Sequence, residues 1–200
     1  MRDDLRSLPD SWYPCFHVHV CILYMIPKAI TAELIRNSPD VFRDLSLYLS
    51  EHRSRITGQP PADFPAGLKQ LCAVVQLDTG INTSGLWGYL SDVTNDDGSI
   101  SEIGEAIGVL AEIGATEIVS ILDEALELWR DFLAVSRPDP TPGQKLSYDD
   151  FHRIRRLRES LDHQMDPLDN EYFHARSKLA NVVANYVRNR PNEFIHPAHA

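Results

Sequence analysis

The sequence has few cysteines and no apolar run long enough to cross a membrane. Its three cysteines, Cys15, Cys21 and Cys72, are an odd number without the spacing of a disulfide framework, which favours a reducing compartment. The longest apolar run, residues 15–26, is shorter than the roughly 20 residues that span a bilayer. We therefore expect a cytoplasmic protein without disulfides and without contact to a membrane.

The sequence also lacks the common motifs of catalysis. It contains no phosphate-binding glycine loop, nucleophile elbow, HExxH motif or paired-cysteine zinc signature. Its many carboxylates fall on helix faces that we expect to be exposed, whereas a general acid needs an apolar pocket that raises its pKa. The sequence therefore predicts a protein that is not an enzyme and holds no cofactor.

Two short patterns resemble metal sites, and both are incomplete. Residues 15–21 alternate cysteine and histidine on one side of a predicted strand at 16–22, but the outer pair would lie about 20 Å apart. A pair of His17 and His19 with distant ligands is the alternative. Residues 93–104 match the middle of a calcium loop, but neither end supplies the required carboxylate. We predict no metal site.

Basic residues are missing from the middle of the chain. No Lys or Arg lies between Lys69 and Arg130, whereas this stretch holds eleven of the 29 acidic residues. They are Asp78, Asp92, Asp96, Asp97, Glu102, Glu105, Glu112, Glu117, Asp123, Glu124 and Glu127. The rest of the chain has 18 acids and 19 bases, so this segment accounts for the net charge of -10. Such a block is either a solvated face or a surface offered to a basic partner.

Apolar residues recur at helical spacing in the first half of the chain. Ser38 and Pro39 are typical of the N-cap and first position of a helix, which we expect over residues 39–54. A second amphipathic helix is expected around residues 68–75. Residues 79–88 contain three glycines, and we predict that they form a turn carrying aromatic anchors.

Residues 99–132 predict two helices with a very short connection. Ser99 and Glu102 form a capping box, and the apolar stripe that follows stops at Gly114 before a new helix begins. Helices joined so tightly should form an antiparallel hairpin. Because the acids mostly fall off the apolar stripe, we expect this hairpin to present carboxylates on a rigid scaffold.

The last third of the sequence predicts a loop and two more helices. Residues 136–147 are rich in proline and form the best candidate loop. A helix is expected over residues 151–161. Asp166 and Pro167 then open a last long helix that ends before Pro191.

The predicted fold class is all-α, a multi-helix bundle with a central antiparallel acidic helical hairpin. Residues 28–195 should form a single domain, because a chain of this length can bury a sufficient core. We expect residues 1–27 to be an extension that is disordered or absent from the native chain, with Met25 as an alternative start. Residues 196–200 are expected to be a tail.

One cluster of basic side chains lies near the predicted loop. Its members are His152, Arg153, Arg155, Arg156 and Arg158. Apolar residues interleave with them, which favours an amphipathic helix whose basic outer face docks near the acidic hairpin or a partner subunit. Direct nucleic-acid binding is the alternative, and the net negative charge opposes it.

Three segments in this order resemble a known family. Residues 76–90 lie where that family has a glycine-rich aromatic turn, residues 104–129 where it has a central helical hairpin, and residues 168–194 where it has a closing helix. They resemble the bacterial DNA-mimic proteins, although residues 82–86 read Asn-Thr-Ser-Gly-Leu where the family reads Asn-Asn-Gly-Gly-Phe. The resemblance implies an all-helical homodimer whose acidic surface imitates duplex phosphates and occupies a DNA-binding protein.

Two functions are consistent with these observations. The first is an acidic interaction module that binds a basic protein, such as a DNA-binding transcription regulator, without direct contact to nucleic acid. Its partner-binding residues would be Asp96, Asp97, Glu102, Glu105, Glu112, Glu117, Asp123, Glu124 and Glu127. The alternative is a small-ligand-binding protein or enzyme whose pocket is lined by Asn82, Gly85, Trp87 and Tyr89.

Overall fold

The computed structural model describes residues 26–52, 60–95, 100–136 and 147–195. Its elements are α1 (Ala32–Asn37), α2 (Val41–His52), α3 (Ala66–Val93), α4 (Ser101–Ile113), α5 (Thr116–Ser136), α6 (Tyr148–Asn189) and a short 3-10 helix, η1 (Pro191–Glu193). The described ranges contain helices and no strand, which confirms the all-α class. None of these helices is long and apolar enough to cross a membrane. The strand predicted at 16–22, the tail, and most of the predicted extension and proline-rich loop lie outside these ranges.

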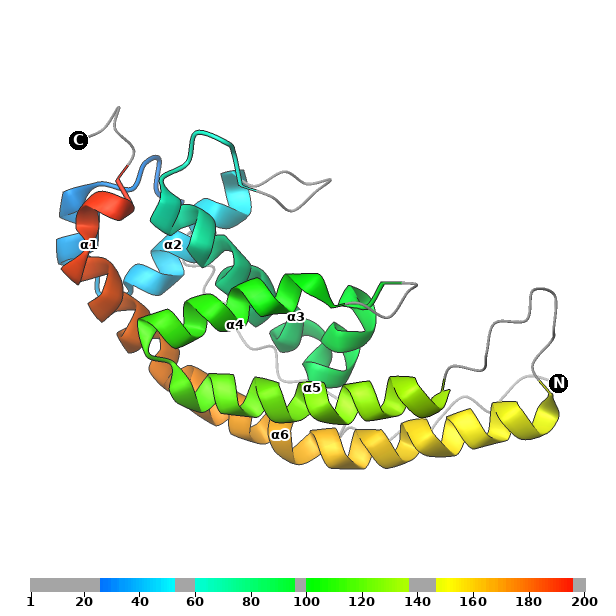
Figure 1. The fold of residues 1–200 in the computed structure, drawn as a ribbon. Helices are drawn as coiled ribbons and strands as arrows, with labels where there is room; N and C mark the ends of the chain where they lie inside the picture. The colour runs from blue at the N-terminus through cyan, green and yellow to red at the C-terminus, as the bar shows by residue number, and fades with distance from the viewer. Residues whose placement is uncertain (1–25, 53–59, 96–99, 137–146, 196–200) are drawn as a thin grey trace, which may run out of the picture.

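The longest helix, α6, forms the spine of the molecule (Figure 1). It runs as a curved rod along the whole length, and α5 lies beside its middle part, with the first turn of α5 near Lys178. Helices α1 and α2 and η1 gather at its C-terminal end, while α3 packs chiefly on α4 and also contacts the spine. The core is built where these helices meet, and its fully buried side chains include Leu45, Leu71, Ile81, Leu110 and Tyr172.

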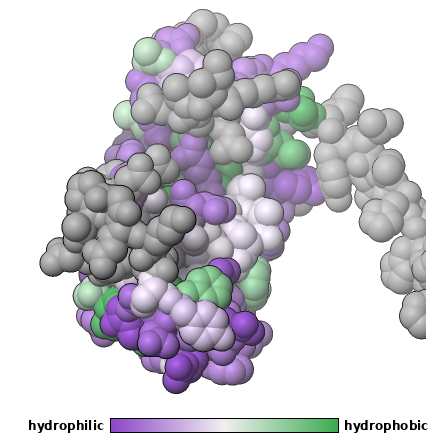
Figure 2. Space-filling model, turned by 90° about the vertical axis from the view of Figure 1, so that its right-hand side faces the viewer, coloured by the Kyte–Doolittle hydropathy of each residue, from purple (hydrophilic) through white to green (hydrophobic). Residues whose placement is uncertain are grey.

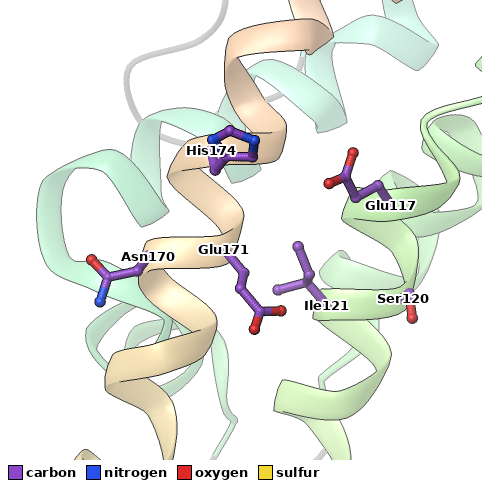
Figure 3. Close-up of a pocket in the computed structure, with 6 residues that line it drawn as sticks. All are labelled: Glu117, Ser120, Ile121, Asn170, Glu171 and His174. Atoms are coloured by element: carbon purple, nitrogen blue, oxygen red, sulfur yellow. The ribbon is translucent and has the colours of Figure 1, made fainter.

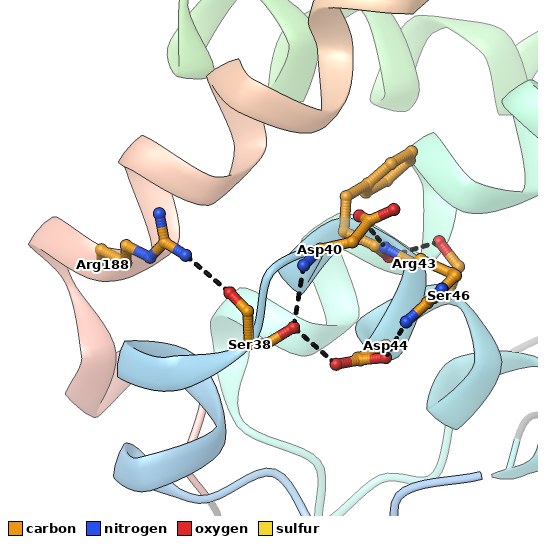
Figure 4. A network of polar contacts seen from close by, with 7 residues as sticks. Ser38, Asp40, Arg43, Asp44, Ser46 and Arg188 are labelled. Carbon is orange, nitrogen blue, oxygen red and sulfur yellow. Dashed lines mark hydrogen bonds and ion pairs between the residues drawn. The ribbon is translucent and has the colours of Figure 1, made fainter. Parts of the chain in front are cut away.

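The start of α2 differs from the prediction. Ser38 ends α1 and does not cap α2, since its N–H donates to the carbonyl of Leu34. Its hydroxyl instead accepts from the N–H of Asp40 at 3.0 Å and donates to Asp44 at 2.6 Å (Figure 4). Asp40 is the capping residue, because its Oδ1 accepts a hydrogen bond from the N–H of Arg43. Pro39 therefore precedes the helix.

The predicted turn at residues 79–88 is wrong, because α3 continues through it to Val93. Only Gly85 leaves the helical conformation, with φ 71° and ψ 175°, and it divides α3 at a kink. Gly80 is needed for packing, since a Cβ there would lie 2.7 Å from Cε2 of Tyr89. Two of the three glycines that favoured a turn therefore have other roles: Gly80 allows close packing against Tyr89, and Gly85 forms a kink inside the helix.

Gly114 ends α4 as predicted. It adopts the left-handed conformation (φ 86°, ψ 20°), its N–H donates to the carbonyl of Ala111, and the N–H of Ala115 donates to that of Leu110. Helix α4 packs chiefly on α3, whereas α5 packs chiefly on α6. Helices α4 and α5 are consecutive in sequence and contact each other, but each packs more extensively on another helix than on its neighbour, so the predicted central hairpin is not confirmed. The start of α4 at Ser101 has no side-chain cap, and Ser99 lies outside the described residues.

The two helices predicted in the last third are one continuous helix. α6 extends over 42 residues and contains Pro167, which we expected to begin a new helix. Its actual N-cap is Ser147, whose hydroxyl accepts from the N–H of Asp150 at 3.1 Å. The buried stripe on α6 includes Met165 and Leu168, on either side of the proline. Tertiary packing of this stripe therefore outweighs the hydrogen bond that proline cannot make.

Candidate partner-binding surface

The acidic side chains of α5 lie on its outer side, opposite the apolar stripe. Ile118, Leu122, Ala125 and Trp129 are buried, as the helical spacing predicted. We use the name acidic face for the exposed carboxylates Asp123, Glu124, Glu127 and Asp131 on this helix. Asp131 was missed in the sequence because Arg130 ended the acidic block, although it follows Glu127 at the helical spacing of four residues.

The acidic face has no neutralising partners within the described residues. None of its four carboxylates takes part in a hydrogen bond or ion pair there, and the same is true of the exposed Glu105 on α4. Neighbouring acids on one helix face repel one another. The acidic face thus places like charges next to one another with no described ion pair to offset them.

Two of the predicted acids are already bound to bases of the same chain. Glu112 accepts hydrogen bonds from the hydroxyl of Tyr186 and from Nη1 of Arg190, both at 2.7 Å. Glu117 accepts from Nζ of Lys178 at 2.8 Å. The hydrogen bond from Tyr186 lowers the pKa of Glu112 most, and that from Lys178 lowers the pKa of Glu117. Both are exposed, but their charge is offset locally.

Three of the predicted acids fall outside this description. Asp96 and Asp97 lie outside the described residues, and so does the side chain of Glu102. Asp78, also in the acidic block, is buried and cannot contribute to a surface.

The residues of the predicted ligand pocket are mostly packed against other side chains. The ring of Trp87 lies edge-on to Trp129 and Phe132, at 4.7 and 5.3 Å between centroids, and the guanidinium of Arg158 lies 5.2 Å above it. Tyr89 is buried. Three hollows among the described residues have linings that do not include these four residues. The pocket therefore stays a prediction.

The largest of these hollows lies between α5 and α6, close to the acidic face. It measures about 550 Å³ and is open to solvent. Glu117, Ser120 and Ile121 line it from α5, and Asn170, Glu171 and His174 line it from α6 (Figure 3). No group of three or more possible metal ligands occurs in the part of the chain that the structure describes. The hollow therefore carries two carboxylates, that of Glu117, which is paired with Lys178, and that of Glu171.

The comparison with protein-family models matches residues 62–190 to the DMP19-like protein family. The chain belongs to the DMP19-like family. This is a family of DNA-mimic proteins, so the resemblance predicted from the sequence is confirmed. No curated protein and no solved structure matches the chain.

The DMP19-like region contains a partly buried ion pair that joins α3 to α6. Asp78 accepts from Arg176 through both carboxylate oxygens, at 2.5 Å from Nε and 2.9 Å from Nη2, and from the hydroxyl of Tyr172 at 3.2 Å. Burial raises the pKa of Tyr172 well above its ordinary value, so this hydroxyl keeps its proton and donates. The pair fixes the spine against the helix that carries the kink at Gly85.

A second contact between α6 and α3 holds the kink itself. The N–H of Leu86, freed because Gly85 is not helical, donates to Oδ1 of Asp169 at 2.7 Å. Asp169 therefore caps the second half of α3, although it is 83 residues away in the sequence. The DMP19-like region is thus braced by two carboxylates, Asp78 and Asp169, neither of which is available to a partner's basic surface at these contacts.

Replacing Asp169 by alanine should lower the free energy of unfolding by about 1 kcal/mol, the usual effect of losing a capping acceptor. Asp169→Asn keeps an acceptor oxygen and should cost less. Burial raises the pKa of Asp169, so folding disfavours the ionised carboxylate relative to the unfolded chain. The contribution of this side chain to stability therefore falls as the pH rises through its pKa. Urea unfolding of both variants at neutral and acidic pH tests this, and equal losses for both would contradict the capping role.

Proposed function

We propose that this protein is a DNA mimic whose acidic face binds the DNA-binding surface of a basic protein, such as a transcription regulator. The observation that supports the proposal most is the set of four exposed carboxylates on one side of α5, none with a partner among the described residues. Membership of the DMP19-like family supports the same role. Binding, and not catalysis, is the proposed activity.

The spacing of the acidic face is compatible with such imitation. An α-helix rises 1.5 Å per residue, so Asp123 and Asp131 lie about 12 Å apart along the axis of α5. Four carboxylates over this length give one negative charge per 3–4 Å, roughly the axial charge spacing of one strand of B-DNA, which is about 3.4 Å. A basic groove that accepts one strand of a duplex could therefore accept this helix.

The proposal assigns a role to the neighbouring helices as well. The pair α4 and α5 would form the acidic hairpin, with Glu105 extending the acidic face onto α4. The hollow lined by Glu117 and Glu171 would receive a long basic side chain at the edge of the contact. We further propose that the protein acts in the cytoplasm and associates as a homodimer.

Neutralising the acidic face should weaken partner binding by at least about tenfold. The variant carries Asp123→Asn, Glu124→Gln and Glu127→Gln, and it is compared with wild type in a pull-down from host lysate. We expect wild type to capture a basic DNA-binding protein that is released by raised salt and by added duplex DNA, because both compete for the same charges.

A matched control changes the same number of charges elsewhere. Glu33→Gln, Glu51→Gln and Glu193→Gln neutralise exposed acids on α1, α2 and η1. This variant should capture the partner as wild type does. If both variants lose the partner equally, only net charge matters and the acidic face has no special role. If duplex DNA fails to release the partner, the contact does not imitate DNA.

A further inference from the structure

A separate hollow lies where the start of α2, the middle of α3 and the C-terminal half of α6 meet. It measures about 430 Å³, within the range of about 300–1,000 Å³ that small-ligand sites occupy, and no residue of α5 lines it. Most of its lining is polar or charged. We use the name polar hollow for this site and define it by the side chains that a ligand would meet: Asp40, Arg43, Ser46, Thr79, Arg176 and Ser177.

Two side chains of the polar hollow can donate hydrogen bonds to a ligand. Arg176 binds Asp78 through Nε and Nη2, and no contact among the described residues uses its Nη1. The exposed hydroxyl of Thr79 likewise makes no hydrogen bond within the described ranges. Arg43 contributes less, because Asp44 lies 3.5 Å from it and offsets its charge. The free edge of a guanidinium together with a hydroxyl suits a carboxylate.

Three oxygens of the polar hollow can accept hydrogen bonds from a ligand. The hydroxyls of Ser46 and Ser177 already donate their protons to carbonyls of their own helices, both at 2.7 Å, so their oxygens are left as acceptors. Oδ1 of Asp40 accepts from the N–H of Arg43 at 3.0 Å, whereas no described contact uses its Oδ2. Figure 4 shows Asp40 and Ser46 at the start of α2. Three acceptors suit an ammonium group, which has three donors and no acceptor.

The charges of the polar hollow oppose a ligand of a single sign. An anion that reached Arg176 would also meet the carboxylate of Asp40. A cation at Asp40 would meet the guanidinium groups of Arg176 and Arg43. A ligand that carries both charges finds an opposite charge for each of its groups. The mixed lining therefore favours a small zwitterion over a simple ion.

We propose that the polar hollow binds a free α-amino acid. The carboxylate of the ligand would accept from Nη1 of Arg176 and from the hydroxyl of Thr79, and its ammonium group would donate to Asp40, Ser46 and Ser177. The ligand would thus join α2, α3 and α6 beside the ion pair that already links two of them. This binding activity goes beyond the proposed function, because the acidic face lies on α5.

The large exposed rings of the molecule lie far from the polar hollow. Tyr148 is 77% exposed and Phe151 is 58% exposed, and both belong to the first turn of α6. That end of the molecule faces the viewer in Figure 2, where hydrophobic side chains lie among hydrophilic ones. A helix rises 1.5 Å per residue, so Tyr148 lies about 40 Å from Arg176 along α6. Recognition in the polar hollow therefore depends on its own polar groups and not on these rings.

Thermal unfolding of the full chain with each natural α-amino acid in turn tests the proposal. The amino acid that fits should raise the Tm by at least about 5 °C at about a hundredfold excess over its Kd, because it binds only the folded state. Acetate and methylamine, which carry one charge each, should have little effect at the same concentration. The proposal is overturned if no amino acid raises the Tm at millimolar concentration, or if either single-charge probe raises it as much.

Two substitutions in the polar hollow keep the local structure and remove one contact each. Asp40→Asn keeps the Oδ1 that caps α2 but removes the charge, and should weaken the Kd of the amino acid at least about tenfold in calorimetric titration. Thr79→Val removes only the hydroxyl and should weaken it about three- to tenfold. The Tm of each variant without ligand checks that it folds.

The matched controls are Asp92→Asn and Thr83→Val, which change the same groups at exposed positions of α3 outside the polar hollow. Both should bind the amino acid as wild type does. If Asp40→Asn binds it no more weakly than Asp92→Asn does, the ammonium group does not lie at Asp40 and the proposal is wrong. All four variants keep the acidic face, so their capture of a basic protein reports separately on the proposed function.

Discussion

Replacing Asp78 by alanine is expected to lower the free energy of unfolding by about 3 kcal/mol, because it leaves Arg176 and the hydroxyl of Tyr172 without their acceptor. Removing one partner of a buried ion pair typically costs about 3–5 kcal/mol. The side chain of Arg176 is 39% exposed, so water can solvate part of its charge, and the lower end of this range applies. Urea unfolding at neutral pH measures the loss.

The control for this prediction is an ion pair of the same type on the surface. Glu159→Ala removes the contact with Arg155, in which both side chains are more than half exposed. Its cost should stay within about 0.5 kcal/mol. If Asp78→Ala costs no more than Glu159→Ala, the contact between α3 and α6 does not hold the fold, and the packing of Tyr172 alone must do so.

Asp78 also shows which part of the acidic surface the sequence could predict. On α5 the apolar period separates buried from exposed positions, and the acids placed outside the stripe are exposed in the structure. Asp78 belongs to the same unbroken acidic block, but its partner Arg176 is 98 residues away. Local sequence patterns carry no information on such a distant contact. The acidic block alone therefore could not distinguish the buried Asp78 from the exposed acids of α5.

The errors in the predicted helices have the same physical cause. Residues 79–88 and Pro167 carry strong local signals against a helix, yet both lie within helices whose apolar sides are buried. Relative to alanine, a helix interior is destabilised by about 1 kcal/mol by glycine and about 3 kcal/mol by proline. The free energy gained by burying several large side chains exceeds both penalties. Gly114 was predicted correctly because no such burial opposes a left-handed residue at a helix end.

Replacing Gly85 by alanine is expected to lower the free energy of unfolding by about 3 kcal/mol. Its φ of 71° with ψ of 175° lies in a region that only glycine adopts readily, and forcing another residue there costs about 1–3 kcal/mol. A Cβ would also lie 2.9 Å from Oδ2 of Asp169 and would push the carboxylate away from the N–H of Leu86. Loss of this cap adds about 1 kcal/mol to the strain.

The matched controls are Gly104→Ala and Gly108→Ala on α4, where an added Cβ meets nothing within 4 Å. Both positions are helical and exposed, so alanine should raise the free energy of unfolding by about 0.5–1 kcal/mol at each. The sign of the effect should thus reverse between α3 and α4.

A double-mutant cycle with Asp169→Ala separates the backbone strain at Gly85 from the loss of the cap. If the displaced cap contributes, the double variant loses less free energy of unfolding than the sum of the losses of the two single variants. If Gly85→Ala changes the free energy of unfolding no more unfavourably than the α4 variants do, the kink is not required for the fold. The cap that Asp169 provides would then not be required either.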